Sequence, residues 1–184
     1  MTSRRYEVNR LYYSYVPLVE GATHWYWDLL APLTGAARTY PFTLAAGSEL
    51  GTPVTVALEV AGYDGAHVTQ LFVNDSLATA QAWTGRTRQV ITATVQPATL
   101  RPGANELRVV AAGTGDLQYV DAFTVTAAQL LGAAQDQAEI VQPAGGQWRY
   151  TVDGFTTPDV AVYDISTPPA LRVMAATVQQ PCPC

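Results

Sequence analysis

Hydrophobic and polar residues alternate with a period of two along several short segments of this chain. The clearest segment is 54–60, where apolar side chains alternate with smaller or polar ones: Val54, Val56, Leu58 and Val60 against Thr55, Ala57 and Glu59. Residues 107–111 repeat the pattern. Because successive side chains of a strand point to opposite faces, both segments predict strands with one buried face. We expect them to be central strands, with four side chains in the core: Val56, Leu58, Leu107 and Val109.

Turn signals separate these segments from others of the same kind. Pro102-Gly103 suits a turn because proline presets φ at the second position and glycine accepts a positive φ at the third. Asn74-Asp75 predicts a hairpin, and residues 97–100 predict a short helical turn. Further strands are expected over residues 4–15, 38–44, 67–73, 77–82, 88–95, 106–112 and 117–126. Closely spaced strands of this kind favour an all-β, antiparallel jelly-roll β-sandwich over an α/β fold.

The pattern changes after residue 127. We expect the sandwich to occupy residues 1–127 and a linker of small and polar residues to occupy 128–138. A small β extension is expected over 139–178, followed by a tail at 179–184. The strands of the extension are predicted at residues 139–141, 148–152, 160–165 and 171–174.

Charge and length exclude several classes of partner. The chain has 184 residues, a net charge of −5 and only 14% charged residues, with no lysine and scattered arginines. Nucleic-acid-binding proteins cluster basic side chains, so no nucleic-acid partner is expected. No apolar run reaches the length of a membrane span, so no membrane partner is expected either. The N-terminus lacks the apolar core of a signal peptide, which fits a cytosolic protein or a fragment of a longer secreted chain, and we favour the fragment.

No catalytic constellation is visible. Neither His24 nor His67 belongs to a His-Glu-x-x-His motif, and no Gly-x-Ser-x-Gly motif is present. Cys182 and Cys184 belong to the expected tail, where preorganised chemistry is difficult. We therefore expect no enzyme activity from this chain, no catalytic residue, no metal and no cofactor. Structural calcium is the alternative, although the acids that would serve as ligands form no Asp-x-Asp pattern: Asp64, Asp75, Asp116 and Asp121.

Tryptophans raise a second hypothesis, carbohydrate binding. Large aromatic rings next to polar loop groups are what a sugar-binding platform needs. Trp83 is expected in a glycine-bounded loop, and we consider it with Asn74 and Asp75 as a candidate ligand-binding site. Burial in the core is the competing interpretation, favoured for Trp25 and Trp27 and equally weighted for Trp83. Residues 74–76 also form a glycosylation acceptor triplet, although Asn-Asp is equally a hairpin turn.

Several short motifs occur in the same order as in a known family. They are His-Trp-Tyr-Trp-Asp at 24–28, Leu-Phe-Val-Asn-Asp at 71–75, Trp-Thr-Gly at 83–85, Leu-Arg-Pro-Gly-Ala-Asn-Glu-Leu at 100–107, Leu-Gln-Tyr-Val-Asp at 117–121, Tyr-Thr-Val-Asp-Gly-Phe at 150–155 and Val-Ala-Val-Tyr-Asp-Ile-Ser-Thr-Pro at 160–168. The series resembles the galactose-binding-like β-sandwich segment that precedes the catalytic domain of gingipain-like (family C25) cysteine peptidases. Most of these motifs also resemble galactose-binding-like jelly rolls in general.

The resemblance implies a role without chemistry of its own. The family's catalytic His-Gly and later Cys have no match here, since neither histidine precedes a glycine. The resemblance implies a non-catalytic module of a secreted or cell-surface bacterial peptidase, positioning or supporting a downstream caspase-like catalytic domain of the same parent chain. A carbohydrate-binding module is the alternative.

Overall fold

The fold is taken from a computed structural model that describes residues 1–16, 22–33, 35–44, 48–128, 130–133, 135–140, 150–165 and 171–173. The chain divides into two units, Met1–Gln129 and Leu130–Cys184. Each unit is considered by itself below. Among the described residues, no helix has the length and apolar character of a membrane span.

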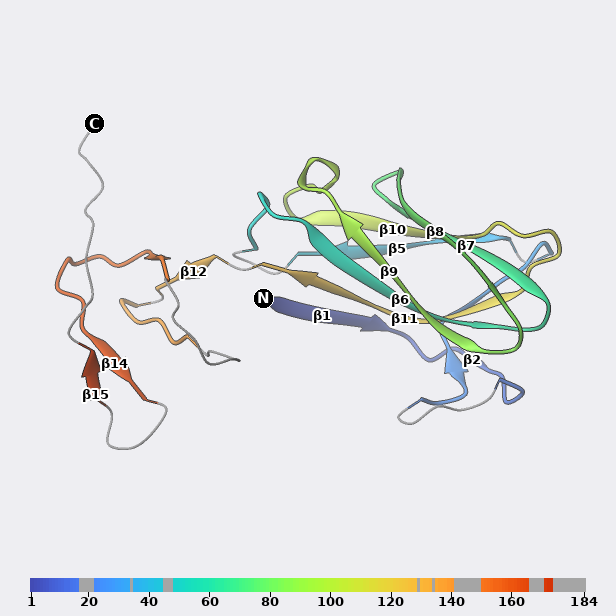
Figure 1. Cartoon of the computed structure of the whole chain (residues 1–184), viewed down its shortest axis with the longest axis horizontal. Coiled ribbons are helices and arrows are strands. Elements are labelled where there is room, and N and C mark those ends of the chain that lie inside the picture. The colour runs from blue at the N-terminus through green and yellow to red at the C-terminus, as the bar shows by residue number, and fades with distance from the viewer. Residues whose placement is uncertain are drawn as a thin grey trace. The chain divides into compact units, whose positions relative to one another are not determined.

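The first unit is an antiparallel β-sandwich of two stacked sheets (Figure 1). One sheet has the order β1-β11-β6-β9, and β4 also pairs with β11. Its strands are β1 (Thr2–Glu7), β4 (Asp28–Leu30), β6 (Val54–Gly62), β9 (Arg88–Val95) and β11 (Gln118–Ala127). The other sheet has the order β5-β10-β7-β8. Its strands are β5 (Ala37–Thr43), β7 (Ala66–Val73), β8 (Ser76–Thr84) and β10 (Ala104–Ala111).

The two segments with the clearest alternation are the central strands that the sequence predicts. β6 lies between β11 and β9, and β10 lies between β5 and β7. The four side chains predicted to be buried are fully buried in one core cluster between the sheets: Val56, Leu58, Leu107 and Val109. The all-β sandwich prediction is confirmed.

The turns predicted from the sequence are also present. Asn74 and Asp75 have φ values of 47° and 68°, so both turn residues between β7 and β8 adopt the left-handed conformation that two-residue hairpins require. Gly103 has a φ of 83° in the turn before β10. The short helical turn expected near residue 97 is the 3₁₀ element η1 (Pro97–Thr99).

The N-terminal segment differs from the prediction of one strand over residues 4–15. β1 ends at Glu7, and the chain then enters a separate two-stranded hairpin of β2 (Leu11–Tyr12) and β3 (Trp25–Tyr26). The division follows from packing, because the ring of Tyr6 stacks on Phe123 of β11 at 4.8 Å while Tyr12 pairs with Trp25 instead. The hairpin therefore projects a group of aromatic side chains away from the core.

In its described residues, the second unit contains two short strand pairs. β12 (Leu131–Gly132) pairs in parallel with β13 (Val152–Asp153), and β14 (Val162–Asp164) pairs antiparallel with β15 (Leu171–Val173). Residues 139–140 of the strand expected at 139–141 are not in a strand. The rest of that strand, Trp148 and the expected tail with Cys182 and Cys184 lie outside the described residues.

Candidate functional site

The structure places Trp83 inside the sandwich. Its side chain is 8% exposed and belongs to the core cluster, and its indole Nε1 donates a hydrogen bond to Thr69 Oγ1 at 2.9 Å. Trp83 is part of β8, directly opposite His67 of β7, and not part of a loop. The interpretation of Trp83 as an exposed stacking platform is therefore wrong, because period-two alternation along β8 turns this ring toward the opposite sheet.

Asn74 and Asp75 lie at the other end of the same hairpin. About seven residues at 3.3 Å each separate the turn from Trp83, a span of roughly 23 Å. The Asn74 amide is also engaged, since Nδ2 donates to Thr99 O at 2.7 Å and to Asn105 Oδ1 at 2.8 Å, and Oδ1 accepts from the Glu106 N–H. The three predicted residues do not form one site, and the Asn74 side chain holds the turn against β10.

A buried polar network surrounds His67. His67 Nδ1 lies 2.6 Å from Asp116 Oδ1, and both side chains are completely buried. Asp116 Oδ2 accepts from the Val68 N–H and from Gln118 Nε2, and Gln118 Oε1 accepts from Thr69. The network links β7 to the start of β11, and so joins the two sheets. An external substrate does not reach these atoms, so we assign the network a structural role.

The acids considered as calcium ligands do not converge. Asp64 pairs with Arg86 at 2.5 Å, Asp121 pairs with Arg88 at 2.8 Å, and Asp116 contacts His67. In the part of the chain that the structure describes, no group of three His, Cys, Asp or Glu side chains is arranged to hold a metal ion.

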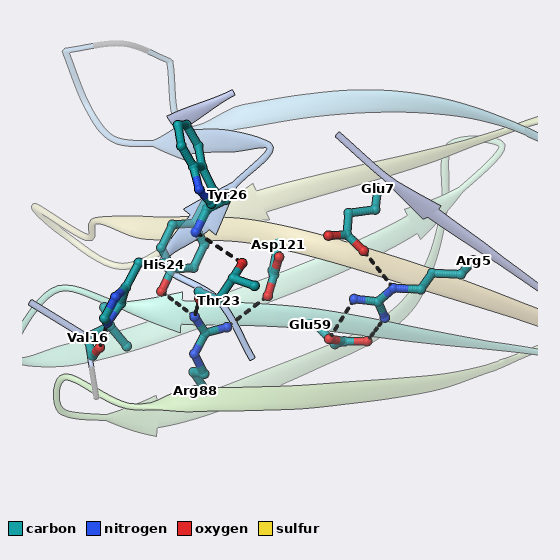
Figure 2. Close-up of polar contacts among 10 residues, drawn as sticks. Arg5, Glu7, Val16, Thr23, His24, Tyr26, Glu59, Arg88 and Asp121 are labelled. Atoms are coloured by element: carbon teal, nitrogen blue, oxygen red, sulfur yellow. Dashed lines mark hydrogen bonds and ion pairs between the residues drawn. The ribbon is translucent and has the colours of Figure 1, made fainter. Parts of the chain in front are cut away.

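A groove of about 590 Å³ follows the solvent face of the five-stranded sheet. Figure 2 shows its charged residues: Arg5 and Glu7 of β1, Asp121 of β11, Glu59 of β6 and Arg88 of β9. Arg5 Nε donates to Glu7 at 2.8 Å, and its terminal nitrogens bind both oxygens of Glu59. The groove is lined by Arg5, Glu7, Ala22, Thr23, Glu59, Val60, Arg88, Gln89, Val90 and Asp121. The basic groups are paired with the carboxylates of the groove. Because a carboxylate oxygen can accept more than one hydrogen bond, these groups and the amide of Gln89 can still bind hydroxyls.

Arg88 closes one end of this groove. One terminal nitrogen donates to Asp121 Oδ2 at 2.8 Å, and the other donates to the Tyr26 hydroxyl at 2.8 Å and to the carbonyl of Thr23 (Figure 2). The guanidinium carbon also lies 5.1 Å from the centre of the Tyr26 ring. Burial raises the pKa of Asp121, and the hydrogen bond from Arg88 opposes that rise. The bonds from Arg88 to Tyr26 and Thr23 join the β2–β3 hairpin to the sheet.

The hairpin carries an exposed aromatic pair, Tyr12 and Trp25. These residues are directly opposite in the β2–β3 register, so both rings lie on one face. Their side chains are 61% and 43% exposed, and their ring centroids lie 5.3 Å apart at an interplanar angle of 65°. The backbone N–H of Trp25 lies 3.3 Å from the hydroxyl of Thr23, which lines the groove. The aromatic pair and the groove are thus connected through the same short segment.

A second group of rings fixes the base of the hairpin. Tyr13 stacks on Tyr119 of β11 at 4.5 Å and also contacts Tyr15 and Tyr63. Tyr15 and Tyr63 remain exposed, whereas Tyr119 is buried. Burial raises the pKa of Tyr119 to about 12. The inner rings supply packing, and the outer rings extend the aromatic surface of this part of the sandwich.

Sequence reasoning missed the aromatic pair. Trp25 was expected in the core, and the structure exposes it; Trp27, with the same expectation, packs against the core and lies 4.5 Å from the Tyr40 ring. The available signal was the density of tyrosines near residue 12 together with the tryptophan cluster near residue 25. The pairing of those two segments was not predicted.

Comparisons with known proteins identify the fold. No family model matches the chain, and no curated protein matches its sequence. Among solved structures, latent dimeric PorU from Porphyromonas gingivalis is similar with a TM-score of 0.53 and 14% identity, over 73% of this chain and 13% of PorU. The family 35 carbohydrate-binding module of Cellvibrio japonicus Abf62 is similar with a TM-score of 0.46 and 14% identity, over 70% and 95% of the chains. The corresponding module from Clostridium thermocellum gives 0.45 and 15%, over 70% and 100%.

Proposed function

We propose that the sandwich is a non-catalytic module that binds carbohydrate through Tyr12 and Trp25. The observation that carries the proposal is the exposure of both rings on one face of the hairpin, beside a polar groove. An exposed indole offers a flat apolar face, and the C–H faces of sugar rings are suitable partners for such an aromatic surface. The groove adds carboxylate and amide groups that bind hydroxyls.

The angle between the rings restricts the ligand. Two rings inclined at 65° cannot both lie flat against one planar array of sugars. We therefore expect one sugar to stack on Trp25 while the chain bends past Tyr12. This geometry favours single, soluble polysaccharide chains over a flat insoluble surface. A small contact of this kind has a dissociation constant on the order of mM to μM.

Titration calorimetry with a panel of soluble oligosaccharides tests the proposal. Trp25→Ala and Tyr12→Ala should each weaken binding at least about tenfold, which corresponds to about 1.4 kcal/mol. Tyr163→Ala is the matched control, because Tyr163 is an exposed aromatic residue of the second unit. Circular dichroism should be unchanged in all three variants. Absence of binding across the panel, or binding that both hairpin variants retain, would contradict the proposal.

A second candidate is an accessory role in a secreted gingipain-like peptidase. It is supported by the ordered motifs over residues 24–168 and by the likeness of fold to a segment that makes up 13% of PorU. In this role the sandwich supports a downstream caspase-like domain of the same parent chain, and the chain itself hydrolyses no peptide.

Reading the gene beyond residue 184 tests the accessory role directly. We expect the frame to continue into a domain with a His-Gly motif and a later catalytic Cys. Deleting the sandwich from that parent should lower its yield of active peptidase, while the purified 184-residue chain should leave casein intact. A frame without such a domain, or a deletion without effect, would refute this second candidate.

A further inference from the structure

Four outermost strands of the sandwich, β1, β5, β8 and β9, differ in how they are protected against pairing with another chain. β1 carries Arg4, Arg5 and Glu7, and β5 carries Arg38 and Pro41. Charges and proline at an edge discourage the addition of a further strand. β8 and β9, which end the two sheets on the other side, have no proline, and their only charged residue is Arg88.

β9 is the more regular of these two unprotected edges. Its pairing with β6 runs without interruption from Val54↔Val95 to Ala61↔Arg88. β8 instead has a register shift, since Leu71 faces Thr79 while Phe72 faces Leu77, and Ala78 is left over. Bulges twist an edge away from a partner. The charge of Arg88 is also engaged by Asp121, so residues 89–95 form an uncharged edge with an uninterrupted register.

We propose that β9 pairs antiparallel with β9 of a second copy of this chain, with Thr92 at the two-fold axis. Centred there, the strand is complementary to itself. Val90 lies opposite the second copy's Thr94, and Ile91 lies opposite the second copy's Ala93. The solvent-facing residues 90, 92 and 94 then meet one another, and the buried Ile91 and Ala93 meet on the core side, where Val95 lies opposite the second copy's Gln89.

Side-chain chemistry supports this register. Val90 is 63% exposed, and pairing with a threonine covers its branched side chain with another β-branched residue. No like charges face each other, because Arg88 lies opposite the second copy's Gln96. The contact uses the same patch on both copies, as closed two-fold dimers require. Shifting the register by one residue would place buried against exposed side chains.

The size of the contact predicts its strength. Eight residues span roughly 26 Å, and two sheets about 10 Å apart give the side of the sandwich a thickness of roughly 20 Å. Two copies therefore bury on the order of 1,000 Å², at the lower limit for specific interfaces. We expect a reversible dimer with a dissociation constant on the order of 10–100 μM.

Cysteine cross-linking of the full chain tests the register. In a background with Cys182→Ser and Cys184→Ser, Thr92→Cys places two thiols across the axis, where paired Cα atoms are about 4.5–5.5 Å apart. That separation allows a disulfide. We expect covalent dimers on mild oxidation of Thr92→Cys. We expect none from the control Val90→Cys, whose counterpart would be Thr94, nor from Ser3→Cys on the charged β1 edge. Absence of cross-linking at 92, or equal cross-linking at all three positions, overturns the proposal.

Sedimentation velocity between about 1 and 500 μM tests the dimer without cysteines. Thr92→Lys places two like charges opposite each other at the axis and should raise the dissociation constant at least tenfold. Ser3→Lys should leave it unchanged. Near-ultraviolet circular dichroism checks that both variants fold. A chain that stays monomeric over the whole range, or a dimer that Thr92→Lys does not weaken, overturns the inference.

Discussion

Replacing Gly62 by alanine should be among the most damaging single-methyl changes in the sandwich. Gly62 ends β6 and lies against the imidazole of His67. A Cβ at this position would lie 2.3 Å from His67 Nε2 and 2.8 Å from the carbonyl oxygen of Gly85. Both distances are below any normal contact between non-bonded atoms, so at least one group must move.

Neither neighbour can move cheaply. The His67 ring is held by Asp116 at 2.6 Å on one side, and its centroid lies 4.2 Å from that of Trp83 on the other. The Gly85 oxygen belongs to the backbone of a tight connection. Overpacking a rigid core costs about 1–3 kcal/mol. With two fixed obstacles, we expect a loss of about 3 kcal/mol of unfolding free energy for Gly62→Ala.

Urea unfolding followed by tryptophan fluorescence measures this loss. Gly51→Ala is the control, because the nearest atom to its Cβ is 3.9 Å away and alanine should stabilise the chain slightly by restricting the unfolded state. His67→Ala removes the ring, so the added cost of Gly62→Ala should fall in the double variant. A loss below about 1 kcal/mol for Gly62→Ala alone would refute the argument that His67 and Gly85 are fixed.

Three further changes test other parts of the structure. Arg88→Met should cost about 3 kcal/mol in urea unfolding, because it leaves the nearly buried Asp121 without its partner; a cost near zero would contradict the buried ion pair. Tyr119→Phe should reduce the loss of stability at alkaline pH. The pKa of Tyr119 is raised from 10.0 in the unfolded chain to about 12 in the folded chain, so the free energy of unfolding falls as the pH rises from 10 to 12. The fall is about 1.4 kcal/mol per pH unit. Urea midpoints between pH 9 and 12 should therefore fall less in this variant. Leu58→Ala should cost about 2–5 kcal/mol by calorimetry, and retention of the wild-type melting temperature would place Leu58 outside the core.

The sandwich was predictable because local patterns and burial agree along its central strands. In residues 54–60 and 107–111 every second side chain is apolar, and these side chains are buried in the structure. The Asn74-Asp75 turn was predictable for a similar reason, since both residues tolerate the positive φ that the hairpin requires.

The candidate site was not predictable because a tryptophan gives little indication of its own environment. Trp83 and Trp25 are both large aromatic residues that can fill a core or bind a ligand. Trp83 donates its indole N–H to Thr69 inside the core, whereas Trp25 lies exposed on a hairpin. Their environments depend on pairing between distant segments, Tyr12 with Trp25 and His67 with Trp83. The hairpin at Asn74-Asp75 was predicted, but its second strand was expected to end at residue 82, before Trp83. The pairing of Tyr12 with Trp25 had no such turn signal between the two segments.

The irregularity in β11 has a consequence for how the chain tolerates length changes. The register against β6 shifts between Val120 and Ala122, and Asp121 is the additional residue. Val120 and Phe123 are three positions apart, so in a regular strand their side chains would point to opposite faces. Both belong to the core cluster, because the bulge between them switches the face to which the later residues point. Deleting Asp121 would restore simple alternation and keep every core side chain of β11 on its present face, although it would also remove the carboxylate partner of Arg88. Deleting a residue at Thr124 instead would turn half of the strand inside out, so this strand has one position at which evolution or a protein engineer can change its length.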